Sequence, residues 1–275
     1  MKTFEINLFD KETEFGFMPT LKAYLLEDNQ SKRKRPAVVV IPGGGYENVS
    51  MSEGERIALS YTPAGFQTFV LKYCVLPHRQ PMALKNIAKA IEIIRKKAEE
   101  WNVDAEKIAV CGFSAGGHLA ASIATLWNDE DVFGPDKEQN IKHRPNASIL
   151  CYPVITSGEY AHKGSFQHLI GSEDEEIWKK YSLENQVDID TPPAFLWHTF
   201  EDKLVPVENS FLYAQALRKK GIPLEMHIYP NGPHGLDCVS EGTFWKVPKY
   251  TRKYPWIEQS IEWLYLTFGI TSIEK

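Results

Sequence analysis

Residues 107–119 (KIAVCGFSAGGHL) constrain the fold of this chain more than any other stretch. The apolar run at 108–111 is typical of a fully buried strand, and the small and apolar residues from Ala115 onward are typical of a helix packed on a sheet. Between them, Gly112-Phe113-Ser114-Ala115-Gly116 fits the pattern G-x-S-x-G. In that pattern a sharp strand-to-helix turn lifts a serine hydroxyl above the sheet, and the flanking glycines make room for the backbone.

Ser114 has two interpretations. Serine is common before a helix because its hydroxyl accepts a hydrogen bond from the first turn. The strand before it and the helix after it are, however, the context that a nucleophilic serine requires. The free N–H groups of a helix N-terminus also favour an anion formed beside the hydroxyl. We therefore predict that Ser114 is a nucleophile.

Strand and helix patterns alternate along the rest of the chain. Residues 2–8 and 21–26 predict an antiparallel edge hairpin, and apolar runs predict buried strands at 36–41, 67–75, 147–152, 194–199 and 224–229. Helices are expected at 53–61, 82–101, 207–220 and 254–268. This alternation predicts an α/β fold with a mainly parallel central sheet and helices on both faces.

The chain is expected to form a single domain over residues 1–275. Residues 154–193 lose the strand pattern, so we predict a cap-like insertion there that lies over the sheet and shapes a substrate pocket. Within it, Ser172 and Glu175 match a capping box for a short helix.

Charge and cysteine usage bound the partners and the setting. Lys and Arg number 31 against 36 Asp and Glu, a net charge of −5, which gives no reason to expect nucleic acid or an anionic membrane as partner. The basic run at 32–35 is expected to be a solvated loop. The N-terminus lacks the apolar core of a signal peptide, and no run approaches a membrane span. Scattered cysteines, three in or beside predicted strands, indicate small buried side chains and a reducing, cytoplasmic setting.

A serine hydroxyl needs a base to take its proton, and a neutral histidine suits that role near pH 7. That histidine needs an acceptor on its other nitrogen. For a serine on such a turn, the chain order is serine, then an acid, then histidine, each in a loop after a late strand. Asp202 follows the strand at 194–199 and His234 follows the strand at 224–229, so we predict both as partners of Ser114. Glu201 is the alternative acid.

Backbone N–H groups are expected to stabilise the oxyanion formed from the attacked carbonyl. One comes from Ala115, the residue after the nucleophile. The others come from the glycines at 43–45, which follow the predicted strand at 36–41. We favour Gly44 and Gly45, with a shift of one residue left open.

The remaining histidines carry no metal-ligand spacing, so no metal site is predicted. His118 is expected to pack inside the helix after Ser114, and His198 to lie within a strand. His143, His162 and His168 have no motif around them.

Five ordered motifs carry a family resemblance: PGGGY from Pro42, SMSEGE from Ser50, GFSAGGHLAA from Gly112, HTFEDKLVPVENS from His198 and GPHGL from Gly232. Together they resemble the α/β-hydrolase fold, and more closely its acetyl-esterase and acetylxylan-esterase-like branch, which is related to the hormone-sensitive-lipase group. The resemblance covers most of residues 36–268. It implies a Ser114–His234–Asp202 triad, a backbone oxyanion hole, no cofactor, and hydrolysis of short acyl esters, often acetyl groups on sugars.

Two departures from the family pattern stand out. Pro42 replaces the histidine of the related HGGG loop, so bulkier lipase substrates are not implied. Residues 236–249 are longer than a bare connection requires and are expected to add an aromatic wall near His234.

The expected partner is a small-molecule or oligosaccharide ester, with acetylated xylo-oligosaccharides as the hypothesis and a homo-oligomer left open. Tyr46, Trp197 and Trp245 are the aromatic residues expected to stack on sugar rings. A prolyl-oligopeptidase-type peptidase, which uses the same triad, is the nearest alternative, although 275 residues leave no room for its usual propeller domain. A non-catalytic binding protein on the same scaffold is a further alternative. It would be signalled by loss of a triad member, and all three are present.

Overall fold

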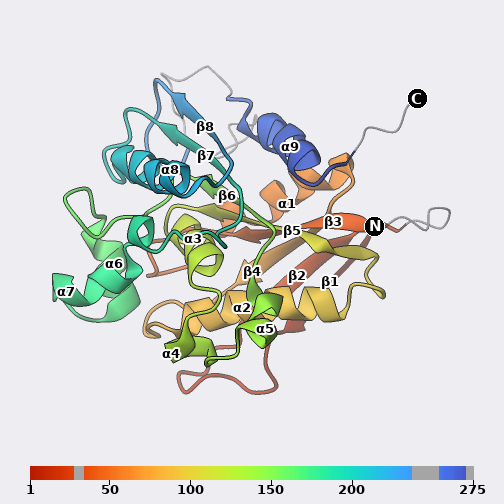
Figure 1. Cartoon of the computed structure of the whole chain (residues 1–275). Helices are drawn as coiled ribbons and strands as arrows, with labels where there is room; N and C mark the ends of the chain where they lie inside the picture. Colours follow the sequence, from red (N-terminus) through yellow and green to blue (C-terminus); the bar gives the residue numbers. More distant parts are fainter. Residues whose placement is uncertain (28–33, 237–253, 271–275) are drawn as a thin grey trace.

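The computed structural model describes residues 1–27, 34–236 and 254–270. Within them, eight strands form one sheet in the order β1-β2-β4-β3-β5-β6-β7-β8 (Figure 1). The strands are β1 (Lys2–Asn7), β2 (Thr20–Leu25), β3 (Arg35–Ile41), β4 (Gln67–Lys72), β5 (Val103–Phe113), β6 (Ala147–Cys151), β7 (Ala194–Thr199) and β8 (Leu224–Tyr229). The edge pairs β1–β2 and β2–β4 are antiparallel, and every pairing from β4 to β8 is parallel.

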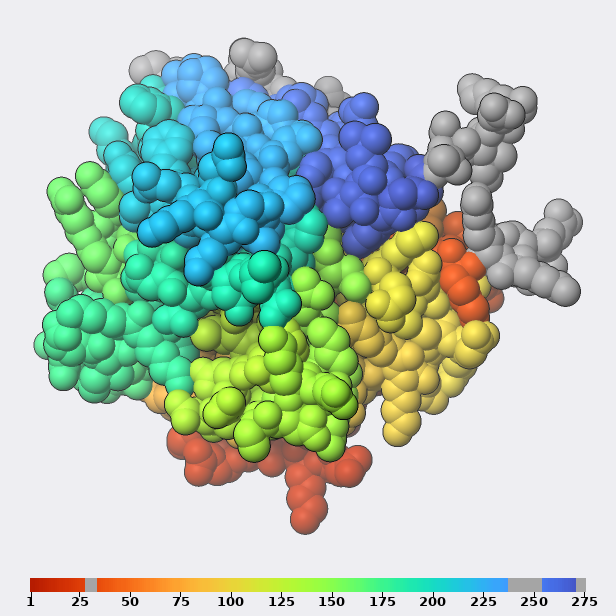
Figure 2. Space-filling model, viewed as in Figure 1, coloured from red at the N-terminus to blue at the C-terminus, as the bar shows by residue number. Residues whose placement is uncertain are grey.

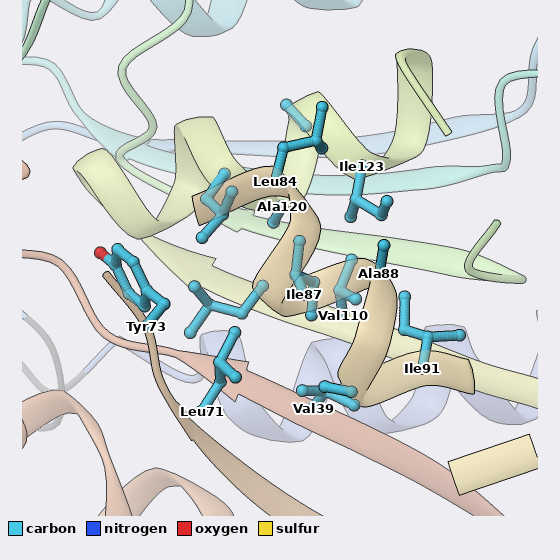
Figure 3. Close-up of a cluster of buried hydrophobic side chains, with 14 of the residues drawn as sticks. Val39, Leu71, Tyr73, Leu84, Ile87, Ala88, Ile91, Val110, Ala120 and Ile123 are labelled. Atoms are coloured by element: carbon cyan, nitrogen blue, oxygen red, sulfur yellow. The ribbon is translucent and has the colours of Figure 1, made fainter. Parts of the chain in front are cut away.

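Helices cover both faces of the sheet, as the α/β pattern predicts. On one face lie α2 (Met82–Lys96), α3 (Ala115–Thr125) and α8 (Glu208–Lys220), and on the other α1 (Glu55–Tyr61) and α9 (Trp256–Thr267). Successive residues of β3 show why. Val39 packs with α2 in the core on one face of the sheet (Figure 3). Val38 and Val40 pack with α1 in the core on the other face. Side chains alternate along a strand, so an unbroken apolar run needs a covering layer on each side.

Short helical segments complete the described chain. They are η1 (Met51–Glu53), η2 (Thr62–Ala64), α4 (Glu130–Phe133), α5 (Lys137–Asn140), η3 (Ile141–His143), α6 (Lys163–Ile170), α7 (Glu175–Trp178), η4 (Lys179–Tyr181) and η5 (Leu183–Asn185).

The predicted elements are present with shifted ends. The largest shifts, five residues each, are at the N-terminus of β5 and at the C-terminus of α2, which ends at Lys96 rather than near Trp101. There the chain folds back, with hydrogen bonds from Trp101 N to Lys97 O and from Val103 N to Ala98 O. β5 consequently begins at Val103, before the apolar run that marks it in the sequence.

Residues 154–193 contain no strand among their described elements and carry α6 and α7 at one margin of the molecule (Figures 1 and 2). The predicted capping box is wrong. Asp174 caps α7 by accepting a hydrogen bond from Glu176 N, while Ser172 Oγ accepts one from Asp174 N. His168 Nδ1 lies 2.9 Å from Gly45 O, so α6 covers the loop after β3. A cap role for this segment stays a prediction.

Cys74, Cys111 and Cys151 are buried free thiols, as their strand positions predict, while Cys238 lies outside the described residues. The cytoplasmic setting inferred from them stays a prediction. Of the basic run at 32–35, Lys32 and Arg33 also lie outside the described residues. Of the helices described, none has the length and apolar character needed to cross a membrane.

Candidate active site

Ser114 lies in a strained turn between β5 and α3. Its φ of 54° and ψ of −118° are unusual for a residue with a side chain, and such conformations cost about 1–3 kcal/mol. The flanking glycines permit it. A Cβ on Gly112 would come within 2.2 Å of Gly116 O, and one on Gly116 within 2.2 Å of Ile41 O. G-x-S-x-G is therefore required here by close backbone packing.

The structure brings Ser114, His234 and Asp202 together from three separate loops. Ser114 Oγ lies 2.8 Å from His234 Nε2, and His234 Nδ1 lies 2.6 Å from Asp202 Oδ2. Because a carboxylate only accepts, Nδ1–H of His234 donates to Asp202, which leaves Nε2 as the acceptor for the serine hydroxyl. This is the arrangement that can deprotonate Ser114.

Asp202 is buried and has hydrogen-bond partners at both oxygens. Oδ1 accepts from the backbone N–H groups of Leu204 and Val205, each at 3.0 Å. Oδ2 accepts from His234 and, at 3.3 Å, from His198 Nε2. Burial alone would raise the pKa of Asp202, but the hydrogen bonds from His198 and His234 outweigh it and hold that pKa well below its usual range. The carboxylate is therefore ionised at neutral pH.

Glu201, the alternative acid, is exposed and holds the loop that carries His234. Its carboxylate accepts hydrogen bonds from Asn231 Nδ2 at 3.1 Å and from Gly232 N at 3.3 Å. The ring of His234 donates its Nδ1–H hydrogen bond to Asp202 and not to Glu201.

The glycine loop after β3 lies beside the serine, because a Cβ on Gly43 would come within 3.1 Å of Ser114 Cβ. Gly44 and Gly45 have φ values of 118° and 64°, which glycine adopts without strain. The N–H of Gly43 is already bonded to Glu53 Oε2 at 2.7 Å, which removes it from the candidate donors. In the described part of the chain, no acceptor is found for the N–H groups of Gly44, Gly45 and Ala115. These three groups remain available to a ligand oxygen.

Three residues near this site were missed by the sequence reasoning: Glu53, Tyr152 and His198. Glu53 bonds to the glycine loop, and Tyr152 donates its hydroxyl hydrogen bond to Glu53 Oε1 at 2.8 Å. His198 was placed correctly within a strand, but its contact with Asp202 was not foreseen. In the sequence, Glu53 stood out only as part of the SMSEGE motif, and that motif indicated no function for it.

The prediction that Tyr46 and Trp197 stack on a sugar is wrong. Their side chains are 2% and 0% exposed. Trp197 stacks on Trp256 with ring centroids 5.2 Å apart, and Tyr46 donates its hydroxyl hydrogen bond to His118 Nδ1 at 2.9 Å. Trp245 and nearly all of the predicted aromatic wall lie outside the described residues.

His118 packs inside α3, as predicted. Its Nε2 lies 2.9 Å from Tyr181 O, and burial lowers its pKa to about 4. It therefore stays neutral and joins Tyr46 to the insertion.

His162 caps α6, because its Nδ1 lies 3.3 Å from the N–H of Ser165. Among the described residues, no three His, Cys, Asp or Glu side chains are grouped as a metal site.

A surface cavity of about 730 Å³ borders the loops of Asp202 and His234. Its lining includes Lys203, Leu204 and Phe200, the last of these 66% exposed. An exposed aromatic ring therefore lies beside the proposed catalytic loops, where Tyr46 and Trp197 do not reach.

The chain is similar in sequence to several known proteins. Residues 24–217 match the protein family described as BD-FAE. The chain is 42% identical over 255 residues to endo-1,4-beta-xylanase B of Butyrivibrio fibrisolvens and 34% identical over 255 residues to an acetylxylan esterase of Xylanibacter ruminicola. Each alignment covers 89% of this chain, but only 39% and 48% of those relatives, so the chain spans less than half the length of either.

A solved structure matches over nearly its whole length. It is an acetyl ester-xyloside bifunctional hydrolase from Caldicellulosiruptor lactoaceticus, with 35% identity and a TM-score of 0.83. The match covers 98% of this chain and 97% of that one. The fold of the described residues is that of the α/β-hydrolases.

Proposed function

This chain belongs to the BD-FAE family, and from that premise we propose that it is a serine carboxylic-ester hydrolase that removes short acyl groups, chiefly acetyl, from acetylated xylo-oligosaccharides or similar sugars. The observation that carries the proposal is the continuous hydrogen-bonded line from Ser114 Oγ through His234 to Asp202. That line supports nucleophilic acyl transfer, with no cofactor needed.

In the proposed reaction His234 Nε2 takes the proton of Ser114 as Oγ attacks the ester carbonyl. The new oxyanion is held by the N–H groups of Ala115, Gly44 and Gly45, and each such donor is worth about 3–4 kcal/mol in the transition state. Asp202, ionised, stabilises the imidazolium that forms. His234 then protonates the departing alcohol, and water repeats the sequence on the acyl-enzyme to release the acid.

Two lines of support favour a carbohydrate ester. An acetylxylan esterase and an acetyl ester-xyloside hydrolase are among the proteins that this chain is similar to. The surface cavity at the loops of Asp202 and His234 also offers an exposed aromatic ring, Phe200, together with the charged side chain of Lys203. Aromatic faces and hydrogen-bonding groups together suit a sugar better than a lipid chain.

A direct test separates the parts of this proposal. A fluorophosphonate probe should label the wild-type protein, and Ser114→Ala should abolish both labelling and activity. Acetate release should be efficient from acetylated xylo-oligosaccharides and should fall as the acyl group of simple aryl esters is lengthened. Labelling without acetate release from the oligosaccharides would rule out the proposed carbohydrate substrate. Preferential cleavage of peptide anilides would favour the peptidase alternative.

A further inference from the structure

Glu53 is a buried carboxylate beside the nucleophile, and no step of the proposed reaction uses it. Its side chain lies at the end of η1 and is held at both oxygens, by Gly43 N at 2.7 Å and by the hydroxyl of Tyr152 at 2.8 Å. A Cβ on Gly43 would lie 2.9 Å from Glu53 Oε2 and 3.1 Å from Ser114 Cβ. The carboxylate, the glycine loop and the nucleophile therefore share one small volume.

Tyr152 contacts both Glu53 and the proposed base, His234. Its ring is fully buried, edge-on to the ring of His234, with centroids 5.0 Å apart and an interplanar angle of 70°. The indole of Trp197 also contacts it, at 5.0 Å and 88°. Tyr152 adopts a φ of 37°, a strained value that persists only where surrounding contacts impose it. Its ring therefore has little freedom to move away from His234.

We propose that Glu53 and Tyr152 are positioning residues that hold the glycine loop and the ring of His234 in register with Ser114. Glu53 fixes the peptide of Gly43 and so sets the direction of the two N–H groups that follow. Tyr152, which is hydrogen-bonded to Glu53, packs against the imidazole of His234 and limits its movement. The inference rests on the proposed acyl transfer and adds a link between its oxyanion donors and its base.

A carboxylate is suited to this position because Gly43 N and the hydroxyl of Tyr152 both donate to it. A backbone N–H can only donate, whereas a tyrosine hydroxyl can also accept. In Glu53→Gln the amide oxygen can keep the hydrogen bond from Gly43, and the amide nitrogen can donate to Tyr152. Glu53→Ala loses both contacts. The glutamine variant should therefore rescue most of what the alanine variant loses.

The test compares kcat and KM for an aryl acetate, with sites counted by fluorophosphonate titration so that unfolded protein does not contribute. Glu53→Ala should lower kcat by about a hundredfold, the scale of a misplacement near 1 Å. Tyr152→Phe should lower it by about tenfold, and Glu53→Gln, which keeps both contacts, by about threefold. KM should stay within about twofold throughout, because a positioning defect acts on the transition state. Affinity for a boronic acid that mimics the tetrahedral intermediate should fall in parallel with kcat.

Matched controls are available in the same chain. Glu55→Gln changes an exposed acid at the start of α1 that pairs with Lys22. Tyr265→Phe removes a hydroxyl on α9 that donates to Ala64 O and touches neither Glu53 nor His234 in the contacts described. Both should leave kcat unchanged. Because Glu53→Ala could fail to fold, Glu53→Gln and Tyr152→Phe decide the matter.

Equal kcat per titrated site in these variants and the controls would overturn the inference, as would a rise in KM alone. A wild-type protein that hydrolyses no ester would overturn the proposed function itself, and this inference with it.

Discussion

His198 Nε2 lies 3.3 Å from the same oxygen of Asp202 that accepts the hydrogen bond of His234. His198 Nε2 also lies 2.9 Å from Val205 O, and its Nδ1 lies 2.8 Å from Ser210 Oγ. Since a carboxylate and a carbonyl only accept, Nε2 must carry a proton and donate to both. The proposed triad therefore has a fourth member behind it, fully buried in β7.

Replacing His198 should weaken the site through Asp202. His198→Leu removes one hydrogen bond to the carboxylate, and a loss of about 1.4 kcal/mol would lower kcat about tenfold. The free energy of unfolding should fall by about 1–3 kcal/mol, because Val205 O and Ser210 lose a buried partner. Steady-state kinetics and urea unfolding measure the two effects. An unchanged kcat would show that His198 supports only the fold, and His227→Leu, at a half-buried histidine on β8, serves as the control.

Asp202 and Glu201 can be separated by neutralising each carboxylate. Asp202→Asn should lower kcat by about 10³–10⁴, because the amide cannot hold His234 in the tautomer that accepts the serine proton. Glu201→Gln should stay within about threefold, since an exposed carboxylate that braces a loop contributes little. The comparison needs only kcat for an aryl acetate. Equal losses in the two variants would contradict the assignment of Asp202.

The turn around Ser114 should not tolerate a methyl group. In Gly116→Ala the new Cβ would lie 2.2 Å from Ile41 O and 2.4 Å from Pro42 O, so the backbone would have to shift. We expect a loss of about 3 kcal/mol or more in the free energy of unfolding. Gly164→Ala, inside α6 with only His162 Cε1 near at 3.7 Å, should instead stabilise by about 0.5–1 kcal/mol. Urea titrations of both variants make the comparison, and similar midpoints would refute it.

Stability should fall in acid because of His118. Its pKa is about 4 in the folded protein against 6.5 as a free group, so between these values the unfolded chain binds more protons. The free energy of unfolding should therefore decrease as the pH falls from about 6.5 to 4, by about 3 kcal/mol from this group. His143, whose pKa burial also lowers to about 4, adds to the same window. Asp202 acts below it, because its depressed pKa contributes stability that is lost only under about pH 4.

Urea unfolding across pH 4–7 measures this dependence. His118→Asn should flatten it, leaving the part that belongs to His143 and to His162, whose pKa burial also lowers. A variant with the slope of the wild type would show that His118 is not the source.

The order of elements could be predicted because strands and helices differ in period, and because sharp turns and late loops mark where a strand ends. Those signals placed Ser114, Asp202 and His234 in loops that directly follow strands, and the structure brings the three side chains together there. Whether they act as a triad is for the kinetic tests above.

Contacts between distant residues could not be predicted from the sequence. Glu53 and Tyr152 are 99 residues apart, and neither position carries a local pattern that reports the other. Trp197 shows the opposite failure. An aromatic residue near a catalytic loop suggested a binding surface, but an inward register on β7 places it in the core against Trp256. Local sequence shows that side chains alternate between the two faces of a strand. What each face packs against depends on tertiary contacts that local sequence does not reveal.

The separation of 120 residues between Ser114 and His234 bears on when this site can first exist. A growing chain that has emerged only through α3 carries the nucleophile and the glycine loop but lacks both the acid and the base. Synthesis must pass β8 before the imidazole can meet the hydroxyl, so on the proposed mechanism no acyl transfer is expected until that strand has paired. Recovery of esterase activity during translation or refolding would therefore time the docking of that strand.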